Sequence, residues 1–221
     1  MTGASRRERK RAATRRHIAD TAARLFGERG YENVSVSEIA RTADVAEQTV
    51  YNYFRTKEQL VTDRGDEIRE RLAALVRERA AGTSAAAAVR DYVLGYVAGI
   101  RDIPADIWRG DLAHLAAASP AVRRLALDIV ADQADAVADA LVASDGASPH
   151  VARLQAKALL GVYQILIEEA GARTRAGQSQ GRIADDLGPV VASLLDELDG
   201  WFGTVREAPP QPPPPSPDDD S

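Results

Sequence analysis

Apolar residues recur three or four positions apart along most of the chain, and no stretch sustains the alternation of apolar and polar residues that a strand needs. The first run of this kind predicts a helix over about residues 14–29. Its apolar face is formed by Ile18, Ala22, Leu25 and Phe26. Gly30 is expected to end this helix, because glycine readily adopts the left-handed conformation of a C-cap, and Tyr31 is placed to fold back on the last turn.

Three further helices are predicted before residue 82. The second begins at Ser35, which together with Glu38 three residues later predicts a capping box, and it ends near residue 42. A turn at residues 43–45 leads to the third helix, over about residues 46–53. A long fourth helix is predicted from about residue 56 to residue 81, with a bend near Gly65, where helix propensity is weakest. A helix of this length is expected to leave one domain and enter another.

Five more helices are predicted in the rest of the chain, which makes about nine in all and an all-α fold. They begin near residues 84, 104, 120, 149 and 182, and the third and fourth each open with a capping serine followed by proline. Gly171 is expected to end the fourth of them. The last two, over about 150–171 and 182–203, carry apolar faces too wide for one small bundle to bury. Such a surplus of apolar surface indicates a homodimer formed through these two helices.

The composition excludes several classes of protein. Cysteine is absent, which removes disulfides, thiolate metal ligands and cysteine nucleophiles. His17, His114 and His150 are too widely spaced to form a metal-binding pair, so neither a metal nor a cofactor is expected. The chain has no run of about 18 apolar residues, and its N-terminus lacks the apolar stretch of a secretory signal. We therefore expect a cytoplasmic protein that does not associate with a membrane.

Charge is distributed unevenly along the chain. The formal net charge is -5, yet residues 1–60 hold 12 lysines and arginines against 8 aspartates and glutamates. Most of this excess lies near the N-terminus, in Arg6, Arg7, Arg9, Lys10, Arg11, Arg15 and Arg16. Residues 1–13 are expected to be a disordered basic arm, either bound to DNA or simply solvated, and residues 206–221 a disordered tail rich in proline and aspartate.

The chain closely resembles the DNA-binding domain of TetR-family repressors in one segment, residues 30–60: GYENVSVSEIARTADVAEQTVYNYFRTKEQL. The pattern is carried by Tyr31, Ser35, Ile39, Ala40, Asp44, Val45, Tyr51, Asn52, Tyr53, Phe54, Lys57 and Leu60. Two positions depart from it. Asp44 stands where the family usually has glycine, and aspartate tolerates the left-handed conformation of such a turn. Ala46 stands where a serine or threonine cap is common, which weakens the start of the third helix by about 0.5–2 kcal/mol.

The resemblance implies a helix-turn-helix DNA-binding domain over residues 14–60 and a helical ligand-binding and dimerisation domain over residues 61–205. Side chains at the start of the third helix would read bases in the major groove: Glu47, Gln48, Thr49 and Tyr51. Glu47 suits the positive end of the helix dipole equally well. Phosphate contacts are expected from Ser35, Ser37, Arg41, Asn52, Tyr53 and Lys57. The chain would then be a repressor that binds a palindromic double-stranded DNA operator as a homodimer and is released by a small molecule, although activation stays open.

A ligand pocket is expected in the second domain, and its signal would pass along the fourth helix. Candidate lining residues are Tyr92, Tyr96, Trp108, His114, Tyr163 and Gln164, although each also suits an ordinary core position. An enzyme is disfavoured, because the chain has no glycine-rich phosphate loop, nucleophile elbow or metal motif, and no catalytic residue is assigned. A protein that binds DNA without sequence preference stays open, since the basic arm alone would provide that.

Overall fold

The computed structural model describes residues 5–63 and 65–207, and within them the chain is helical with no strand. The N-terminal helices are α1 Arg6–Arg29, α2 Val36–Thr42, α3 Glu47–Tyr53 and α4 Glu58–Val61. They are followed by α5 Gly65–Arg77, α6 Ala85–Gly99, α7 Ala105–Trp108, α8 Leu112–Ala118, α9 Pro120–Asp145, α10 Pro149–Arg175 and α11 Gln180–Glu207. Single turns of 3₁₀ helix lie at Tyr31–Asn33 and Ile100–Asp102. The predicted all-α fold is confirmed.

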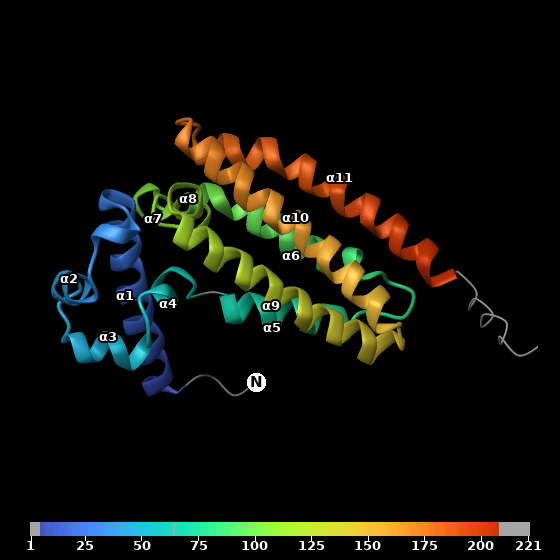
Figure 1. Cartoon of the computed structure of the whole chain (residues 1–221), viewed down its shortest axis with the longest axis horizontal. Coiled ribbons are helices and arrows are strands. Elements are labelled where there is room, and N and C mark those ends of the chain that lie inside the picture. The colour runs from blue at the N-terminus through green and yellow to red at the C-terminus, as the bar shows by residue number, and fades with distance from the viewer. Residues whose placement is uncertain (1–4, 64, 208–221) are drawn as a thin grey trace, which may run out of the picture.

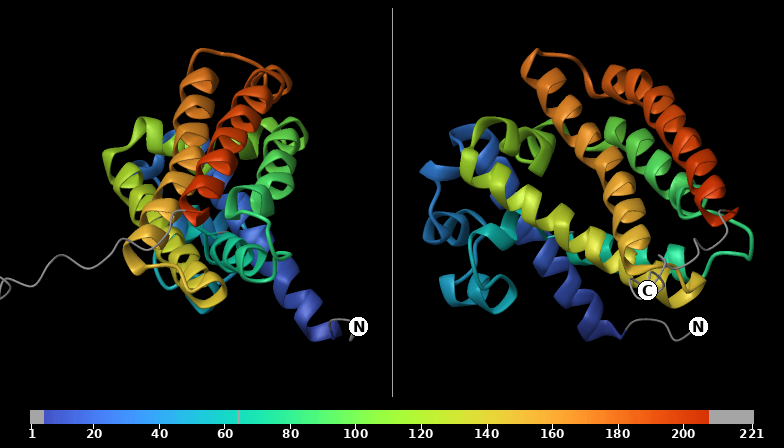
Figure 2. Two further views of the ribbon diagram at one scale, coloured as in Figure 1. Left: turned by 90° about the vertical axis from the view of Figure 1, so that its right-hand side faces the viewer. Right: turned by 45° about the vertical axis from the view of Figure 1, so that its right-hand side comes forward.

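The four N-terminal helices lie together at one end of an elongated bundle built from α5, α6, α9, α10 and α11 (Figure 1). The short helices α7 and α8 lie at the end of the bundle that meets α1. Helices α10 and α11 run side by side along the bundle in all three views (Figures 1 and 2). None of the described helices is both long and apolar enough to cross a lipid bilayer.

Two of the predicted helices are broken, which accounts for eleven helices where about nine were expected. The long fourth helix does not exist as one element: α4 ends at Val61, and the Gly65 N–H donates to the Thr62 carbonyl 2.8 Å away in the turn that precedes α5. The helix expected after Pro104 is divided into α7 and α8 at Gly110. Asp111 restarts it as an N-cap, because its carboxylate accepts from the Ala113 N–H at 3.1 Å.

Two predicted helix ends are also wrong. Helix α1 begins at Arg6 rather than near residue 14, so the part of the basic arm from residue 6 onward is helical. Helix α10 continues past Gly171 to Arg175. Gly171 is needed there for close packing rather than as a cap, because a Cβ at this position would lie 2.4 Å from the Ala113 carbonyl oxygen of α8. Residues 1–4 of the predicted arm and 208–221 of the predicted tail lie outside the described residues.

The buried side chains form two cores. One fills the bundle, with Val89, Val137, Leu160 and Leu187 among its fully buried members. The other is built around Ile18, Phe26, Ile39, Val50 and Phe54 of the N-terminal helices. Four residues of this second core come from beyond the predicted domain boundary, namely Leu115, Ala116, Val122 and Ala126 of α8 and α9. The N-terminal domain therefore shares its core with the start of α9 instead of standing apart from the bundle.

Candidate DNA-binding interface

The turn after α1 is fixed by Tyr31, as the sequence predicted. Gly30 ends α1 as predicted and has a positive φ of 82°, but its ψ of 149° lies outside the left-handed helical conformation that was expected. The Tyr31 ring folds back on Phe26, with 5.2 Å between the ring centroids. The Lys57 ammonium lies 4.2 Å from the centre of the Tyr31 ring and donates to the Tyr31 carbonyl at 2.5 Å. Burial, reinforced by the Glu58 carboxylate, raises the pKa of the Tyr31 hydroxyl, and burial lowers the pKa of Lys57. The Lys57 ammonium thus holds the start of α4 against the turn that follows α1.

The start of α2 is capped, but not by the full capping box that was predicted. The Ser35 hydroxyl accepts from the Glu38 N–H at 3.2 Å, as expected. The Glu38 carboxylate, however, pairs with Arg29 of α1, and no reciprocal bond to the Ser35 backbone is found among the described residues. The second half of the box is missing because an arginine from another helix competes for the carboxylate.

The turn between α2 and α3 has the left-handed residue that the sequence predicted. Asp44 has a φ of 52° and is the only residue other than glycine with a positive φ in the described part of the chain. The Val45 N–H then donates to the Ala40 carbonyl at 3.0 Å, which closes the turn. Ala46 is the N-cap of α3, and no side chain of the described residues caps the free N–H groups at the start of this helix. The missing cap is thus confirmed, and α3 depends on packing of Val50 and Phe54, both almost fully buried, for its position.

The face of α3 opposite the buried Val50 is exposed. Helical periodicity places Gln48 and Asn52 at the centre of this face, one turn apart, and the Gln48 amide donates to the Asn52 side-chain oxygen at 3.3 Å. Glu47 is exposed at the N-terminal end, Tyr51 is 42% exposed on one side, and Thr49 is half-buried on the other. Of the four residues predicted to read bases, Gln48 therefore lies at the centre and the other three lie around it. Asn52, predicted to contact phosphate, lies beside Gln48.

The other predicted phosphate contacts differ in how freely they project. Ser35 and Ser37 are exposed at the start of α2 with 3.1 Å between their hydroxyl oxygens, and Arg41 is exposed on the same helix. Tyr53 is half-buried, with the Arg11 guanidinium 5.9 Å from the centre of its ring. Lys57 is turned inward to Tyr31, as described above. Only the part of its ammonium that faces away from Tyr31 can approach a phosphate.

Arg15 has a positioning role that the sequence did not reveal. Its Nε donates to the Asp63 carboxylate at 2.6 Å, and another guanidinium nitrogen donates to the Tyr53 carbonyl at 2.8 Å. The same guanidinium lies 4.5 Å from the centre of the Phe54 ring. These contacts join α1 to the end of α3 and to the connection between α4 and α5. The sequence placed Arg15 only among the basic residues near the N-terminus, although it shares a helix face with the apolar Ala22, which was the available signal.

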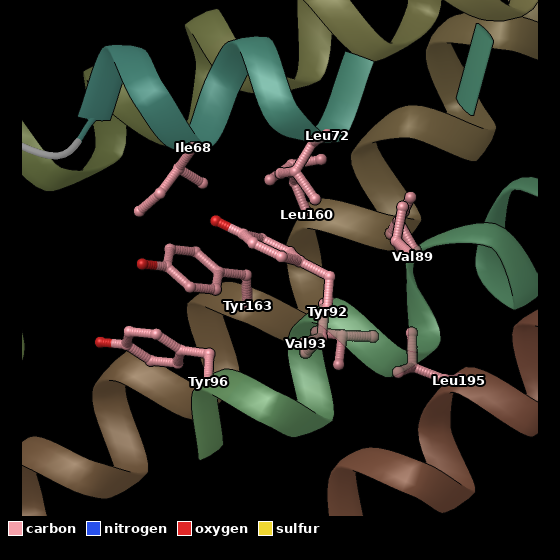
Figure 3. A pocket seen from close by; sticks show the side chains of 11 residues that line it. Ile68, Leu72, Val89, Tyr92, Val93, Tyr96, Leu160, Tyr163 and Leu195 are labelled. Atoms are coloured by element: carbon pink, nitrogen blue, oxygen red, sulfur yellow. The ribbon is translucent and has the colours of Figure 1, made fainter. Parts of the chain in front are cut away.

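Three of the six predicted pocket residues line one cavity in the bundle. Tyr92, Tyr96 and Tyr163 lie beside one another with their hydroxyl groups on the same side (Figure 3), and the rings of Tyr96 and Tyr163 are 6.0 Å apart. The cavity measures about 20 Å³ and is otherwise apolar. A larger cleft of about 520 Å³ shares Ile68, Tyr96 and Tyr163 with it and extends to α1 and the connection between α4 and α5.

The other three predicted pocket residues lie elsewhere. Trp108 is buried and its indole N–H donates to the Thr174 hydroxyl at 2.8 Å, which ties α7 to α10. His114 on α8 has a buried Nδ1 without a hydrogen-bond partner among the described residues, and burial lowers its pKa, with Arg175 and Arg109 acting in the same direction. Gln164 donates to the Glu168 carboxylate at 3.0 Å. Sequence spacing alone does not separate these residues from the three tyrosines.

The arrangement of α1, α2 and α3 is that of a helix-turn-helix DNA-binding domain. Residues 18–63 match the sequence model of the family described as bacterial regulatory proteins, tetR family. The chain is 42% identical over 57 residues to a protein of Mycobacterium tuberculosis named as transcriptional regulator MftR, covering 26% of this chain and 29% of that protein. It is 39% identical over 79 residues to the HTH-type transcriptional regulator BetI of Rhizobium meliloti, covering 36% of this chain and 37% of BetI.

These matches span about a third of the relatives' own length, and beyond the N-terminal domain only the fold is shared. NalD of Pseudomonas aeruginosa, the secondary repressor of the MexAB-OprM efflux pump, superposes with a TM-score of 0.51 over 86% of this chain and 95% of that chain, at 18% identity. The N-terminal domain of the chain is thus similar in sequence to the DNA-binding domain of the tetR family of bacterial regulatory proteins. The curated relatives that the chain matches are named as transcriptional regulators.

Proposed function

We propose that this chain binds a palindromic operator with sequence specificity, as a homodimer, and represses transcription until a small molecule releases it. The observation that supports specific binding is the exposed face of α3, where Gln48 and Asn52 are surrounded by Glu47, Thr49 and Tyr51. Gln48 and Asn52 can each make a bidentate contact with adenine, and Glu47 can accept from cytosine. Each good bidentate contact discriminates between bases by about 1–3 kcal/mol.

Selection of bound sequences from random duplex DNA tests this proposal. The full-length protein should enrich a palindrome whose half-site centres lie about 34–36 Å apart, or a multiple of that distance. Gln48→Ala should relax the preference at one position of each half-site while the other positions keep theirs. Enrichment of no sequence at physiological salt would instead support a protein that binds DNA without sequence preference.

The dimer is proposed to form through α10 and α11. Three large apolar side chains on these helices are unusually exposed: Leu154 at 58%, Ile165 at 45% and Val190 at 45%. Leu154 and Ile165 are eleven residues apart, so they lie on the same face of α10 three turns apart. Exposed apolar side chains that line up along two adjacent helices are typical of a surface that a partner covers.

A charged substitution on this face tests whether it forms the dimer interface. Leu154→Glu should shift the protein from dimer to monomer in sedimentation equilibrium, and operator affinity should fall with it. Leu127→Glu on α9 is the matched control, because Leu127 is also 45% exposed but lies on a different helix. An equal effect of both substitutions, or none from Leu154→Glu, would contradict the proposed interface.

The effector is proposed to bind in the cleft beside Tyr96 and Tyr163. The inner cavity of about 20 Å³ holds no more than a water molecule, whereas the cleft of about 520 Å³ falls in the range of ordinary ligand sites. A compound in the cleft would contact both α1 and the bundle, and it would release DNA only if it prefers one arrangement of the two. Compounds that raise the melting temperature of the wild type should lose this effect with Tyr163→Ala and keep it with Tyr51→Ala.

A further inference from the structure

The basic N-terminal segment is a rigid extension of α1. Its first turn is closed by a reciprocal capping box: the Glu8 N–H donates to the Ser5 hydroxyl at 3.2 Å, and the Ser5 N–H donates to the Glu8 carboxylate at 2.6 Å. Helix α1 has 24 residues, which corresponds to a length of about 36 Å. Each basic side chain of this segment therefore has a fixed direction relative to the rest of the N-terminal domain.

Three arginines lie in one row along this helix. Arg7, Arg11 and Arg15 are four residues apart, so each lies about 6 Å further along the axis on nearly the same face. Arg15 donates to the Tyr53 carbonyl at the end of α3, and Arg11 lies 5.9 Å from the centre of the Tyr53 ring. Arg7 is exposed one turn beyond Arg11. The row thus begins at the C-terminal end of α3, the proposed recognition helix, and leads away from it.

Two other basic residues of the extension face away from the row. Helical periodicity places Arg9 and Arg16 on the side of α1 opposite the row, and both are exposed. The Glu8 carboxylate is engaged in the cap, so it is held back at the backbone of residue 5. Positive charge on the side of α3 is therefore concentrated in Arg7 and Arg11.

We propose that Arg7 and Arg11 bind the phosphate backbone just outside the half-site that α3 contacts, an inference that depends on the proposed operator binding. Phosphates follow one another every 3.4 Å along the axis of each strand, so two arginines whose backbone positions are about 6 Å apart along the helix can reach separate phosphates. Arg15 acts as a positioning residue, because its bonds to Tyr53 and Asp63 fix the row relative to the recognition helix. A disordered arm would hold these arginines at no fixed position relative to α3.

A pair of double variants tests the proposal. Arg7→Gln/Arg11→Gln removes the row, and Arg9→Gln/Arg16→Gln removes the same charge from the opposite side of the same helix. Both variants keep residues with good helix propensity, and circular dichroism checks that α1 persists. The dissociation constant for the selected operator is measured between about 50 and 300 mM salt, a range in which phosphate contacts change affinity strongly.

The row variant should bind the operator at least about tenfold more weakly at the low-salt end, and its dependence on salt should be less steep. Each phosphate contact contributes about 0.9 to the slope of log affinity against log salt, so losing two per subunit reduces the slope by up to about 3.6 for the dimer. Phosphate ethylation outside the half-sites should interfere with binding of the wild type and not of the row variant. The control variant should retain most of the slope.

Equal losses in the two variants would show that the extension attracts DNA only diffusely, and no loss in either would show that α1 does not reach DNA. Either result would contradict the proposed binding of phosphates by Arg7 and Arg11. Each can be distinguished from failure of operator binding itself, in which the wild type would select no palindrome in the first place.

Discussion

Replacement of Gly110 by alanine tests how closely the N-terminal domain is packed on the bundle. A Cβ at this position would lie 1.7 Å from the Ala23 carbonyl oxygen of α1, where contacts below 3.0 Å are essentially never found. The turn between α7 and α8 would therefore have to separate from α1 by about 1.3 Å. Gly27 of α1 is packed in a similar way, since its Cβ would lie 2.9 Å from backbone and side-chain carbons of Arg109.

The expected loss of stability follows from the nature of this contact. Overpacking typically destabilises a protein by about 1–3 kcal/mol. The new Cβ would meet the backbone of Ala23, which cannot turn away as a side chain can, so the loss for Gly110→Ala is expected near the upper limit. For a chain of this length each kcal/mol shifts the melting temperature by about 2–4 °C, so a decrease of roughly 6–12 °C is expected. Because α1 also carries Arg15, operator affinity should fall as well.

Gly95→Ala is the matched control for this experiment. Gly95 lies within α6, and no described atom lies within 4 Å of the position that a Cβ would take there, so alanine should stabilise the helix by up to about 1 kcal/mol. Both variants are melted at one protein concentration, since dimerisation makes the melting temperature depend on concentration. A Gly110→Ala protein that melts at or above the wild-type temperature would refute the close packing of α1 on α7.

Two further substitutions concern single residues. Asp44→Gly should raise the free energy of unfolding by up to about 1 kcal/mol, measured by urea denaturation, because glycine adopts the φ of 52° without a Cβ clash. Asp44→Val should lower the free energy of unfolding. Burial lowers the pKa of His114 in the fold, so the unfolded chain takes up a proton first as pH falls. The stabilisation is complete above about pH 6.5 and decreases below it, and His114→Gln should flatten the melting temperature between about pH 5 and 7.

The elements that the sequence predicted well are those fixed by local chemistry. Gly30 with Tyr31, the serine at the start of α2 and the left-handed Asp44 each act within a few residues of themselves, so their effect can be recognised without knowing the fold. The same holds for Ser119 and Pro120 at the start of α9, where the Ser119 hydroxyl caps the helix. Helix α10 begins at Pro149 as predicted, but Ser148 was wrongly expected to cap it, because its side chain makes no cap hydrogen bond. The helix-turn-helix domain was predictable because it consists almost entirely of such signals.

The features that were missed depend on neighbours distant in sequence. The Glu38 carboxylate pairs with Arg29 instead of completing the capping box, and Arg15 pairs with Asp63. Gly171 packs against the backbone of α8 instead of ending α10. Likewise, which tyrosines share a cavity depends on how α6 packs on α10. Periodicity places such residues on a face of a helix but does not say what that face meets.

Helix α1 contacts both the recognition helix α3 and the bundle, so we infer that it positions α3 more than the chain connection between α4 and α5 does. The expected long fourth helix is interrupted between Val61 and Gly65, so it cannot act as one rigid lever between the domains. Contacts from α1 and the turn that follows it are more extensive: Arg24 pairs with Asp106 at 2.7 Å, and the Ser119 hydroxyl donates to Glu32 at 3.0 Å.

These contacts are continuous with a core that the two parts of the chain share, through Leu115 and Val122. The cleft proposed for the effector is bounded on one side by α1 itself and on the other by α9 and α10. A compound that widens the cleft would have to move α1 against α9, and Arg15 would transmit that movement to the end of α3 through its bond to the Tyr53 carbonyl. Because the row formed by Arg7 and Arg11 belongs to the same rigid helix, one displacement would withdraw both the recognition helix and the flanking phosphate contacts from the operator.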